Sequence, residues 1–268
     1  MPQFLQLFNT VLILLIGKQN RPCLVILKNK VMGTIKGKRV LLFGATGGIG
    51  AKVAELLIGG GATVFLLARN AQKLQDLAVQ LSVPEGQYFT VDITDAAAVD
   101  TAVAQVVAGG GVDILINAVG VGIIKPLETL THQDFMDSLQ INLVGSFNAV
   151  KAVMPAMKEA KKGLIINIPG VLGKVPMAGA AAYSASKYGI VGMMQSIREE
   201  VKRTEIRITN LFLGGVDSPF WDTIDLRVQK DKMIVAEEAA RAIWFLCQQP
   251  RSGVVSEMVL QPFNHQAI

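Results

Sequence analysis

A tyrosine and a lysine four residues apart, Tyr183 and Lys187, are the side chains of this sequence best suited to proton transfer. Residues four apart share one face of a helix, so the phenol hydroxyl and the ammonium can face a single cleft. An unperturbed phenol has a pKa near ~10, and a neighbouring cation together with a bound nicotinamide would lower that pKa by favouring the phenolate. We therefore expect Tyr183 to exchange a proton with a carbonyl oxygen near neutral pH, with Lys187 as its activator. The pair alone is weak evidence, because chance places Tyr-x-x-x-Lys in many helices.

A glycine-rich segment, Gly44-Ala-Thr-Gly-Gly-Ile-Gly50, lies about 140 residues before this pair. It follows the apolar run 38–43, which is typical of a buried parallel strand, and it precedes an amphipathic helical pattern at 51–58. Glycines between a strand and a helix leave backbone N–H groups free at the positive helix end, where a pyrophosphate can bind. We predict phosphate contacts here, and the alternative is a tight turn without a ligand. The candidate residues are Gly44, Thr46, Gly47, Gly48, Ile49 and Gly50.

Strand-like apolar runs and helical patterns alternate along the rest of the chain. The expected strands cover 63–67, 87–91, 112–116, 163–168, 207–212 and 254–260, and the expected helices include 70–81, 95–107, 131–157, 183–203 and 237–248. Such alternation is typical of a continuous parallel sheet, and a sheet covered on both faces accounts for the mean hydropathy of +0.42. The sequence thus predicts one α/β domain at 37–268. We expect a doubly wound Rossmann-like fold of about seven parallel strands with helices on both faces.

The glycine turn, the Tyr183 and Lys187 pair and the segment Asn117-Ala-Val-Gly120 together resemble the short-chain dehydrogenase/reductase family over roughly residues 37–262. The resemblance implies hydride transfer between a nicotinamide and a carbonyl or secondary alcohol, with Tyr183 as the acid/base. It implies that Lys187 also holds the nicotinamide ribose and that Asn142 takes part in a proton relay through a water. The further cofactor contacts that it implies are Asp92, Ile93, Asn117, Ala118, Gly120, Val216 and Ser218.

The sequence departs from the family's pattern at places that face the substrate and the cofactor. The family has a serine 13 residues before the tyrosine, where this chain has Gly170, and no serine or threonine occurs from 161 to 182. Loss of a comparable oxyanion donor costs on the order of 10²–10³ in rate. Phe43 also replaces a threonine before the first glycine, and Leu213 replaces a proline. These departures indicate a divergent member.

The end of the second expected strand indicates the cofactor. An acid at this place binds the ribose 2′-hydroxyl of NAD, whereas a nearby arginine accommodates the 2′-phosphate of NADP. The segment Leu66-Leu67-Ala68 offers no acid, and Arg69 follows directly. The sequence therefore favours NADP over NAD. The alternative is that Arg69 only solvates the strand end.

Composition excludes several other kinds of function. Four of the 26 basic residues and none of the 21 acidic ones lie in residues 1–31, so the remaining chain is nearly neutral and carries no basic run for nucleic acid. Cys23 and Cys247 lie far apart and, with His132 and His265, show no metal-ligand spacing. We expect no metal, no disulfide framework and a reducing, cytoplasmic location.

Residues 1–36 stand outside the strand and helix pattern. Residues 4–16 form an apolar run that is short of the ~20 residues needed to span a bilayer, without the flanks of a signal peptide. Three interpretations stay open for this extension: a peripheral membrane anchor through 4–16, a disordered or packed segment, or a start codon assigned upstream of Met32.

The sequence is thus interpreted as an NADP-dependent oxidoreductase acting on a small carbonyl or alcohol, with the usual serine replaced by Gly170. The alternative is a dinucleotide-binding protein with little or no turnover that acts as a redox-responsive partner or scaffold. Residues 215–235 are the expected substrate lid, in which Phe220 and Trp221 suggest a partly apolar wall. By resemblance we expect a homodimer or homotetramer joined through the helices at 131–157 and 183–203.

Overall fold

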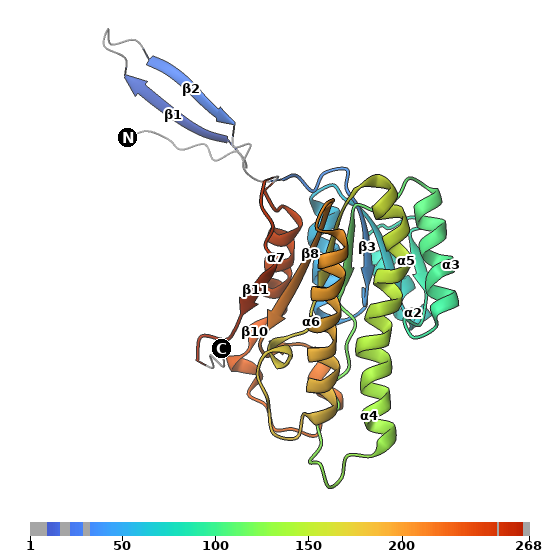
Figure 1. The fold of residues 1–268 in the computed structure, drawn as a ribbon. Helices are drawn as coiled ribbons and strands as arrows, with labels where there is room; N and C mark the ends of the chain where they lie inside the picture. The colour runs from blue at the N-terminus through green and yellow to red at the C-terminus, as the bar shows by residue number, and fades with distance from the viewer. Residues whose placement is uncertain (1–9, 17–21, 29–32, 251, 265–268) are drawn as a thin grey trace.

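The computed structural model describes residues 10–16, 22–28, 33–250 and 252–264, and its centre is a seven-stranded parallel sheet (Figure 1). The strand order is β11-β8-β7-β6-β3-β4-β5, which confirms the predicted doubly wound α/β fold. The strands are β3 (Arg39–Phe43), β4 (Thr63–Ala68), β5 (Tyr88–Thr90), β6 (Ile114–Asn117), β7 (Lys162–Asn167), β8 (Glu205–Leu213) and β11 (Glu257–Leu260). The chain order reverses between β3 and β6, and a crevice at such a point is where open α/β sheets bind ligands.

Helices cover both faces of the sheet, because alternate strand residues point to opposite sides. In β3, Val40 and Leu42 pack in a core with α1 (Gly48–Gly59), α2 (Ala71–Gln80) and α7 (Ala236–Cys247). Leu41 and Phe43 pack in a second core with α3 (Ala96–Ala108), α5 (Gly145–Ala160) and α6 (Ala181–Val201). The near-continuous apolar strands are therefore explained by burial on both faces.

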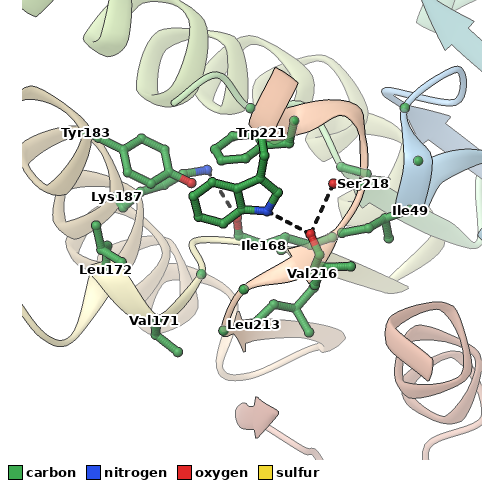
Figure 2. A pocket seen from close by; sticks show the side chains of 18 of the residues that line it. Ile49, Ile168, Val171, Leu172, Tyr183, Lys187, Leu213, Val216, Ser218 and Trp221 are labelled. Carbon is green, nitrogen blue, oxygen red and sulfur yellow. Dashed lines mark hydrogen bonds between the residues drawn. The ribbon is translucent and has the colours of Figure 1, made fainter. Parts of the chain in front are cut away.

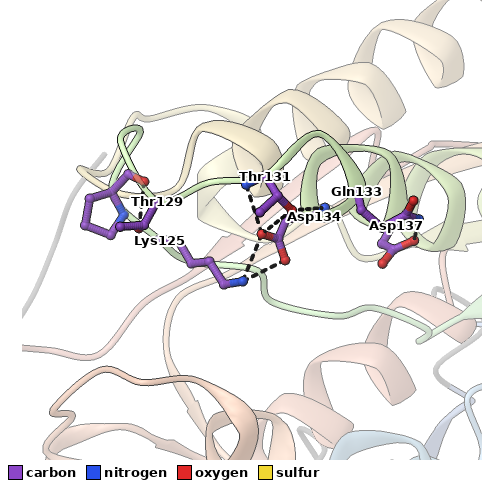
Figure 3. A network of polar contacts seen from close by, with 7 residues as sticks. Lys125, Thr129, Thr131, Gln133, Asp134 and Asp137 are labelled. Carbon is purple, nitrogen blue, oxygen red and sulfur yellow. Dashed lines mark hydrogen bonds and ion pairs between the residues drawn. The ribbon is translucent and has the colours of Figure 1, made fainter.

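Helix ends follow the capping residues of the sequence. Asn70 and Asp95 each accept a hydrogen bond from a backbone N–H at the start of α2 and α3. Gly61, with φ of +83°, supplies the left-handed residue of the turn after α1. At the start of α4 (His132–Ser138), Thr131 and Asp134 form a capping box, and the Lys125 ammonium pairs with the same carboxylate at 2.7 Å (Figure 3).

The expected long helix 131–157 is interrupted, which corrects the sequence-based prediction. The chain forms α4, then a π-helical segment at Leu139–Val144, then α5, which runs to Ala160. Asn142 lies in the π segment and is fully buried. A single π turn changes neither composition nor apolar spacing enough to be visible in the sequence, although an asparagine within a helical pattern marked the place.

Strand boundaries differ from the predicted ones by a few residues. The run 87–91 gives β5 at Tyr88–Thr90, 112–116 gives β6 at Ile114–Asn117, and 254–260 gives β11 at Glu257–Leu260. Val91 and Val112 are buried just beyond the strand ends and Val254 is 52% exposed, so apolar character alone overestimates strand length at these ends.

The N-terminal extension contributes a separate sheet of two strands. β1 (Thr10–Ile16) pairs antiparallel with β2 (Pro22–Lys28). Residues 1–9, 17–21 and 29–32 lie outside the described residues, so the three interpretations of 1–36, including membrane contact through 4–16, stay predictions. Among the described helices, none has the length and hydrophobicity that crossing a membrane requires.

Candidate active site

Two adjoining cavities lie at the carboxyl ends of the parallel strands. One has a volume of about 270 Å³ and contains Tyr183, and the other has a volume of about 400 Å³ and lies toward β4 and β5. Both are lined by Gly47, Ala118, Val119 and Gly120, so they form one elongated cleft at the reversal between β3 and β6. This shape suits an elongated ligand that places one part in each cavity.

The glycine turn forms the floor between the two cavities, and its glycines are sterically required. Gly44 has a φ of +78°, and a Cβ atom built on it would lie 2.8 Å from the carbonyl carbon of Ala118. A Cβ atom on Gly50 would collide with the carbonyl oxygen of Gly44. On Gly48 it would lie 2.8 Å from the Cβ atom of Ser218, so the turn is closed against the lid as well. The backbone of α1 therefore starts directly at the cleft, as a pyrophosphate site requires.

Arg69 and Asp92 line the larger cavity together with Thr46 and Ile93. Arg69 is exposed at the end of β4, where the sequence places the determinant of the cofactor. Hydrogen bonds from the Thr94 backbone and hydroxyl lower the pKa of the Asp92 carboxyl, and the Arg69 charge adds a smaller effect. Asp92 thus stays ionised and held by Thr94.

Tyr183 and Lys187 lie on one face of α6 and both line the smaller cavity, as their spacing predicted (Figure 2). The Lys187 ammonium is 3% exposed, lies 5.4 Å from the centroid of the Tyr183 ring and donates to the Ile168 carbonyl oxygen at 3.3 Å. Burial lowers the pKa of Lys187 to about 8. The pair is therefore held largely out of water.

The pKa of the Tyr183 phenol is shifted in the direction opposite to the one the sequence suggested. Burial raises the pKa of Tyr183 above its usual range, because removal from water penalises the phenolate. The sequence-based expectation was for a phenol beside both the Lys187 cation and a bound nicotinamide, and it did not include burial, which spacing does not reveal. With its pKa raised, Tyr183 holds its proton as a neutral phenol.

Asn142 does not line either cavity but braces the loop that faces Lys187. Its amide nitrogen donates to the Val121 carbonyl and to the Ser186 hydroxyl, both at 3.0 Å, and its amide oxygen accepts from the Val121 N–H at 2.9 Å. The Ser186 hydroxyl donates in turn to the Tyr183 carbonyl at 2.7 Å. A Cβ atom on Gly120 would lie 3.2 Å from the Lys187 ammonium and 3.5 Å from the Asn142 amide oxygen. The structure thus brings Asn142 close to the Tyr183 and Lys187 pair across a glycine.

Asn117 also lies behind the cleft wall. It is 3% exposed, its amide donates to the Ser146 hydroxyl at 2.8 Å, and its amide oxygen accepts from the Val119 N–H at 3.1 Å. These bonds fix the turn after β6. Ala118 and Gly120 in that turn contact both cavities, whereas Asn117 positions them.

The loop after β7 carries Gly170, the residue that the sequence analysis expects in place of the family's serine. Gly170 lines the smaller cavity with φ of +69° and ψ of 171°, a conformation that is essentially restricted to glycine. The departure is therefore more than the loss of a hydroxyl, because the backbone itself has a shape that L-residues avoid.

The expected lid contributes two aromatic residues to the cavity wall. β9 (Val216–Asp217) pairs parallel with β10 (Ile234–Val235), and the segment between them begins with a 3₁₀ turn at Pro219–Thr223. The Phe220 ring centroid lies 6.0 Å from that of Tyr183, and the Trp221 indole N–H donates to the Val216 carbonyl at 2.9 Å. Val216 and Ser218, the predicted cofactor contacts, line the same cavity.

Several wall residues escaped the sequence analysis. Ile124, Leu172 and Met177 line the cavity that contains Tyr183, and Gln140 and Ile141 line the larger one. The first three come from loops that meet only in the folded chain. Their positions carry no periodic pattern, so no signal in a single sequence identifies them.

A doubly wound sheet with a glycine turn and a buried Tyr and Lys pair at its carboxyl edge defines a Rossmann-type oxidoreductase domain. The chain belongs to the short chain dehydrogenase family, because the profile of that family matches residues 38–228. This confirms the family that the motifs indicated.

Relatives and solved structures agree with this assignment. The chain is 34% identical to a D-threitol dehydrogenase from Mycolicibacterium smegmatis, over 79% of this chain and 86% of that protein. It is 30% identical to a metagenomic short-chain oxidoreductase solved with NADP, with a TM-score of 0.72, over 85% of this chain and 98% of the other. An alcohol dehydrogenase from Thermococcus sibiricus, complexed with 5-hydroxy-NADP, shares the fold with a TM-score of 0.78 at 24% identity, over 86% and 99% of the two chains.

Proposed function

We propose that this protein is an NADP-dependent oxidoreductase that transfers hydride between the nicotinamide and a carbonyl or secondary alcohol, with Tyr183 as the acid/base. One observation carries the proposal: the Tyr183 phenol and the buried Lys187 ammonium face one cavity that continues into the glycine turn. The arrangement supplies a proton donor, a cation to stabilise its conjugate base, and a cleft for a dinucleotide.

The residues along the cleft fit a nicotinamide dinucleotide. The backbone from Gly44 to Gly50 is close-packed at the start of α1, so N–H groups and the helix dipole meet a pyrophosphate without a side chain between them. Arg69 would contact a 2′-phosphate, and no acid stands at the end of β4 to select a 2′-hydroxyl. Two of the similar solved structures hold NADP or its derivative. We therefore propose NADP over NAD.

The chain's own part of the reaction is proton transfer. Bound NADPH supplies a hydride to the carbonyl carbon. Tyr183 donates its hydroxyl proton to the carbonyl oxygen, and the nearby Lys187 ammonium stabilises the phenolate that remains. Positioned acid catalysis of this kind contributes typically about 10²–10⁴ in rate. With a pKa of about 8, Lys187 also loses and regains protons readily, which suits it to reprotonate Tyr183.

Asn142 has a positioning role in this proposal. It holds Val121 opposite Lys187 and, through Ser186, the carbonyl of Tyr183. Asn142 makes these hydrogen bonds from the π-helical segment, which holds its side chain in position for all of them. We propose that the segment keeps the proton path between Tyr183 and Lys187 in order.

A second candidate is favoured by Gly170. Without a hydroxyl at this position, the substrate oxygen lacks a donor whose loss costs on the order of 10²–10³ in rate. A protein that binds the dinucleotide with little turnover, acting as a redox-responsive partner or scaffold, would tolerate that loss.

Binding and turnover separate the two candidates. NADPH and NADH binding are measured by intrinsic fluorescence on the full chain and on Arg69→Gln, with Lys73→Gln on the exposed face of α2 as the matched control. NADPH oxidation is then followed with a panel of ketones on the full chain and on Tyr183→Phe. The proposal predicts tighter binding of NADPH, a loss of that preference in Arg69→Gln alone, and turnover that falls at least about 10²-fold in Tyr183→Phe. Binding without turnover would favour the second candidate, and no binding would contradict both.

We also propose a homodimer or homotetramer joined through the α4–α5 and α6 surfaces. Met136, Phe147 and Tyr188 on these helices are 42%, 43% and 43% exposed, although their side chains are large and apolar or aromatic. Light scattering on the purified chain tests this, and a monomer at micromolar concentration would contradict it.

A further inference from the structure

The side chains that line the cavity around Tyr183 are mostly apolar. The far side of this cavity consists of Ile124, Val171, Leu172, Met177, Phe220 and Trp221. Among the described residues that line it, the only ionisable side chains are Tyr183 and Lys187 themselves, and Ser218 is the one further side chain with a hydroxyl. A substrate in this cavity therefore meets mainly hydrocarbon and aromatic side chains, with the polar side chains gathered at Tyr183, Lys187 and Ser218.

The polar groups of the wall are engaged within the protein (Figure 2). The Trp221 indole N–H and the Ser218 hydroxyl both donate to the Val216 carbonyl oxygen, at 2.9 and 3.4 Å, and the Lys187 ammonium donates to the Ile168 carbonyl. In the described part of the chain, no protein group forms a hydrogen bond with the Tyr183 hydroxyl, which points into the cavity. The Tyr183 hydroxyl is thus available to donate to a substrate oxygen, beside the Lys187 ammonium.

The aromatic side of the cavity, formed by Phe220 and Trp221, packs against Gly122. A Cβ atom on Gly122 would lie 2.6 Å from Phe220 Cζ and 2.6 Å from Ile224 Cδ1, so both lid side chains occupy the space that a larger residue at this position would fill. Phe220 also contacts Tyr183 and packs edge-on against Trp221, with ring centroids 5.3 Å apart. Phe220 and Trp221 are therefore held in the cavity wall by packing against their neighbours.

Such a wall discriminates between substrates by desolvation. A carboxylate, phosphate or hydroxyl placed against the far side of the cavity, away from Tyr183 and Lys187, loses its water and meets only apolar side chains, which is costly, whereas an alkyl or aryl group gains from burial there. The volume of about 270 Å³ must also admit the nicotinamide, so the substituents on the carbonyl are compact.

We infer that the substrate is a compact, uncharged ketone, or the matching secondary alcohol, with apolar alkyl or aryl groups on both sides of the reacting carbon. The inference rests on the proposed function. In the reducing direction the ketone carbon gains the hydride of NADPH and the ketone oxygen gains the proton of Tyr183, which yields the secondary alcohol and NADP⁺. Keto acids, polyols and phosphorylated sugars are disfavoured by the apolar side chains on the far side of the cavity.

Matched pairs of ketones test the inference on the full chain with NADPH. Phenylacetone and phenylpyruvate share a skeleton and differ by a methyl against a carboxylate next to the carbonyl, and butanone and hydroxyacetone differ by a methyl against a hydroxyl. We expect kcat/KM to be higher for the apolar member of each pair by about 10-fold or more. A preference for phenylpyruvate or hydroxyacetone would overturn the inference and leave the proposed function standing.

A charge placed in the wall sharpens the test. Leu172 is partly exposed at the cavity wall, so Leu172→Arg adds a cation beside the substrate, with Leu172→Met as the matched apolar control. We expect the ratio of phenylpyruvate to phenylacetone turnover to rise at least about 10-fold in Leu172→Arg and to stay unchanged in Leu172→Met. An unchanged ratio in both variants would contradict the assignment of this wall to the substrate.

A binding measurement distinguishes failure of the inference from failure of the proposed function. Quenching of Trp221 fluorescence by each compound is read in the presence of NADP⁺ as the difference between the full chain and Trp221→Phe. Stronger quenching by phenylacetone than by phenylpyruvate supports the inference even where no ketone is turned over, an outcome that contradicts only the proposed hydride transfer. Stronger quenching by phenylpyruvate would overturn the inference.

Discussion

At the scale of single residues, burial disfavours the charged forms of both Tyr183 and Lys187. Lys187 is buried with one carbonyl partner, and burial shifts its pKa to about 8 while raising that of Tyr183. An isolated buried ammonium destabilises a fold, and such costs are concentrated where the group has a function. The free-energy cost of burying the Lys187 ammonium can therefore be measured as a loss of folding stability.

Replacement of Lys187 by methionine is expected to stabilise the protein while abolishing turnover. A shift in pKa from 10.5 to about 8 corresponds to about 3 kcal/mol below pH ~8. Between pH ~8 and ~10.5 the unfolded chain binds more protons at this lysine than the folded chain, so the stability of the unmodified protein rises with pH and the difference between the two proteins shrinks. Thermal melts from pH 6 to 10 measure it, with exposed Lys73→Met as the control. A Lys187→Met variant that is less stable than the unmodified chain at pH 7 would contradict the assigned burial cost.

Because of the backbone conformation at Gly170, we expect that a serine introduced there will not provide a hydrogen-bond donor for the substrate oxygen. With φ of +69° and ψ of 171°, any L-residue there is strained by about 1–3 kcal/mol. Gly170→Ser and Gly170→Ala are therefore expected to lower the melting temperature by similar amounts, and neither is expected to raise kcat/KM. If Gly170→Ser alone raised kcat/KM well above Gly170→Ala, the loop would accommodate a serine and this account of the departure would be wrong.

At the scale of elements, most of the scaffold could be predicted because its signals are local. Apolar runs marked the seven strands, and Asn70, Asp95 and Thr131 marked helix starts that the structure has within one residue. The π segment at Leu139–Val144 was not predicted, because it conserves the apolar face on either side of Asn142. The pocket wall was predicted only at Phe220 and Trp221, since Ile124, Leu172 and Met177 come from loops whose meeting depends on tertiary structure.

The capping box at the start of α4 connects this element to the cleft. The Asp134 carboxylate accepts from the Thr131 backbone and hydroxyl and from the Lys125 ammonium, whose pairing lowers the pKa of Asp134 to about 2 (Figure 3). The Lys125 N–H donates to the Gly179 carbonyl at 2.7 Å, so the box also holds the loops that carry Ile124 and Met177. The network thus fixes one wall of the pocket.

Removing the cap at Thr131 is expected to destabilise the protein without affecting the dinucleotide end of the cleft. Thr131→Ala removes the side-chain acceptor and is expected to cost about 1 kcal/mol, whereas Thr131→Ser retains it and is expected to cost much less. Urea unfolding measures the difference, and NADPH affinity is expected to be equal in both variants. Equal stability of the alanine and serine variants would show that the cap contributes nothing.

At the scale of the whole molecule, the order of the strands assembles the site. The ends of β3, β6, β7 and β8 meet at one edge, which brings the glycine turn, the Asn117 turn, Gly170 and the lid around α6. The topology and the family could be predicted from motifs spread over the chain. The direction of the Tyr183 pKa shift could not, because burial is a property of the assembled cleft and of no single motif.

Transfer of a labelled hydride tests the central claim most directly. The full chain is incubated with phenylacetone and NADPH carrying deuterium at C4, in separate reactions for the two positions, and the alcohol is analysed by mass spectrometry. The account predicts an alcohol with one deuterium on the carbinol carbon from one of the two labelled forms, and none in Tyr183→Phe beyond a trace. Tight NADPH binding with no labelled alcohol from any ketone tried would contradict it.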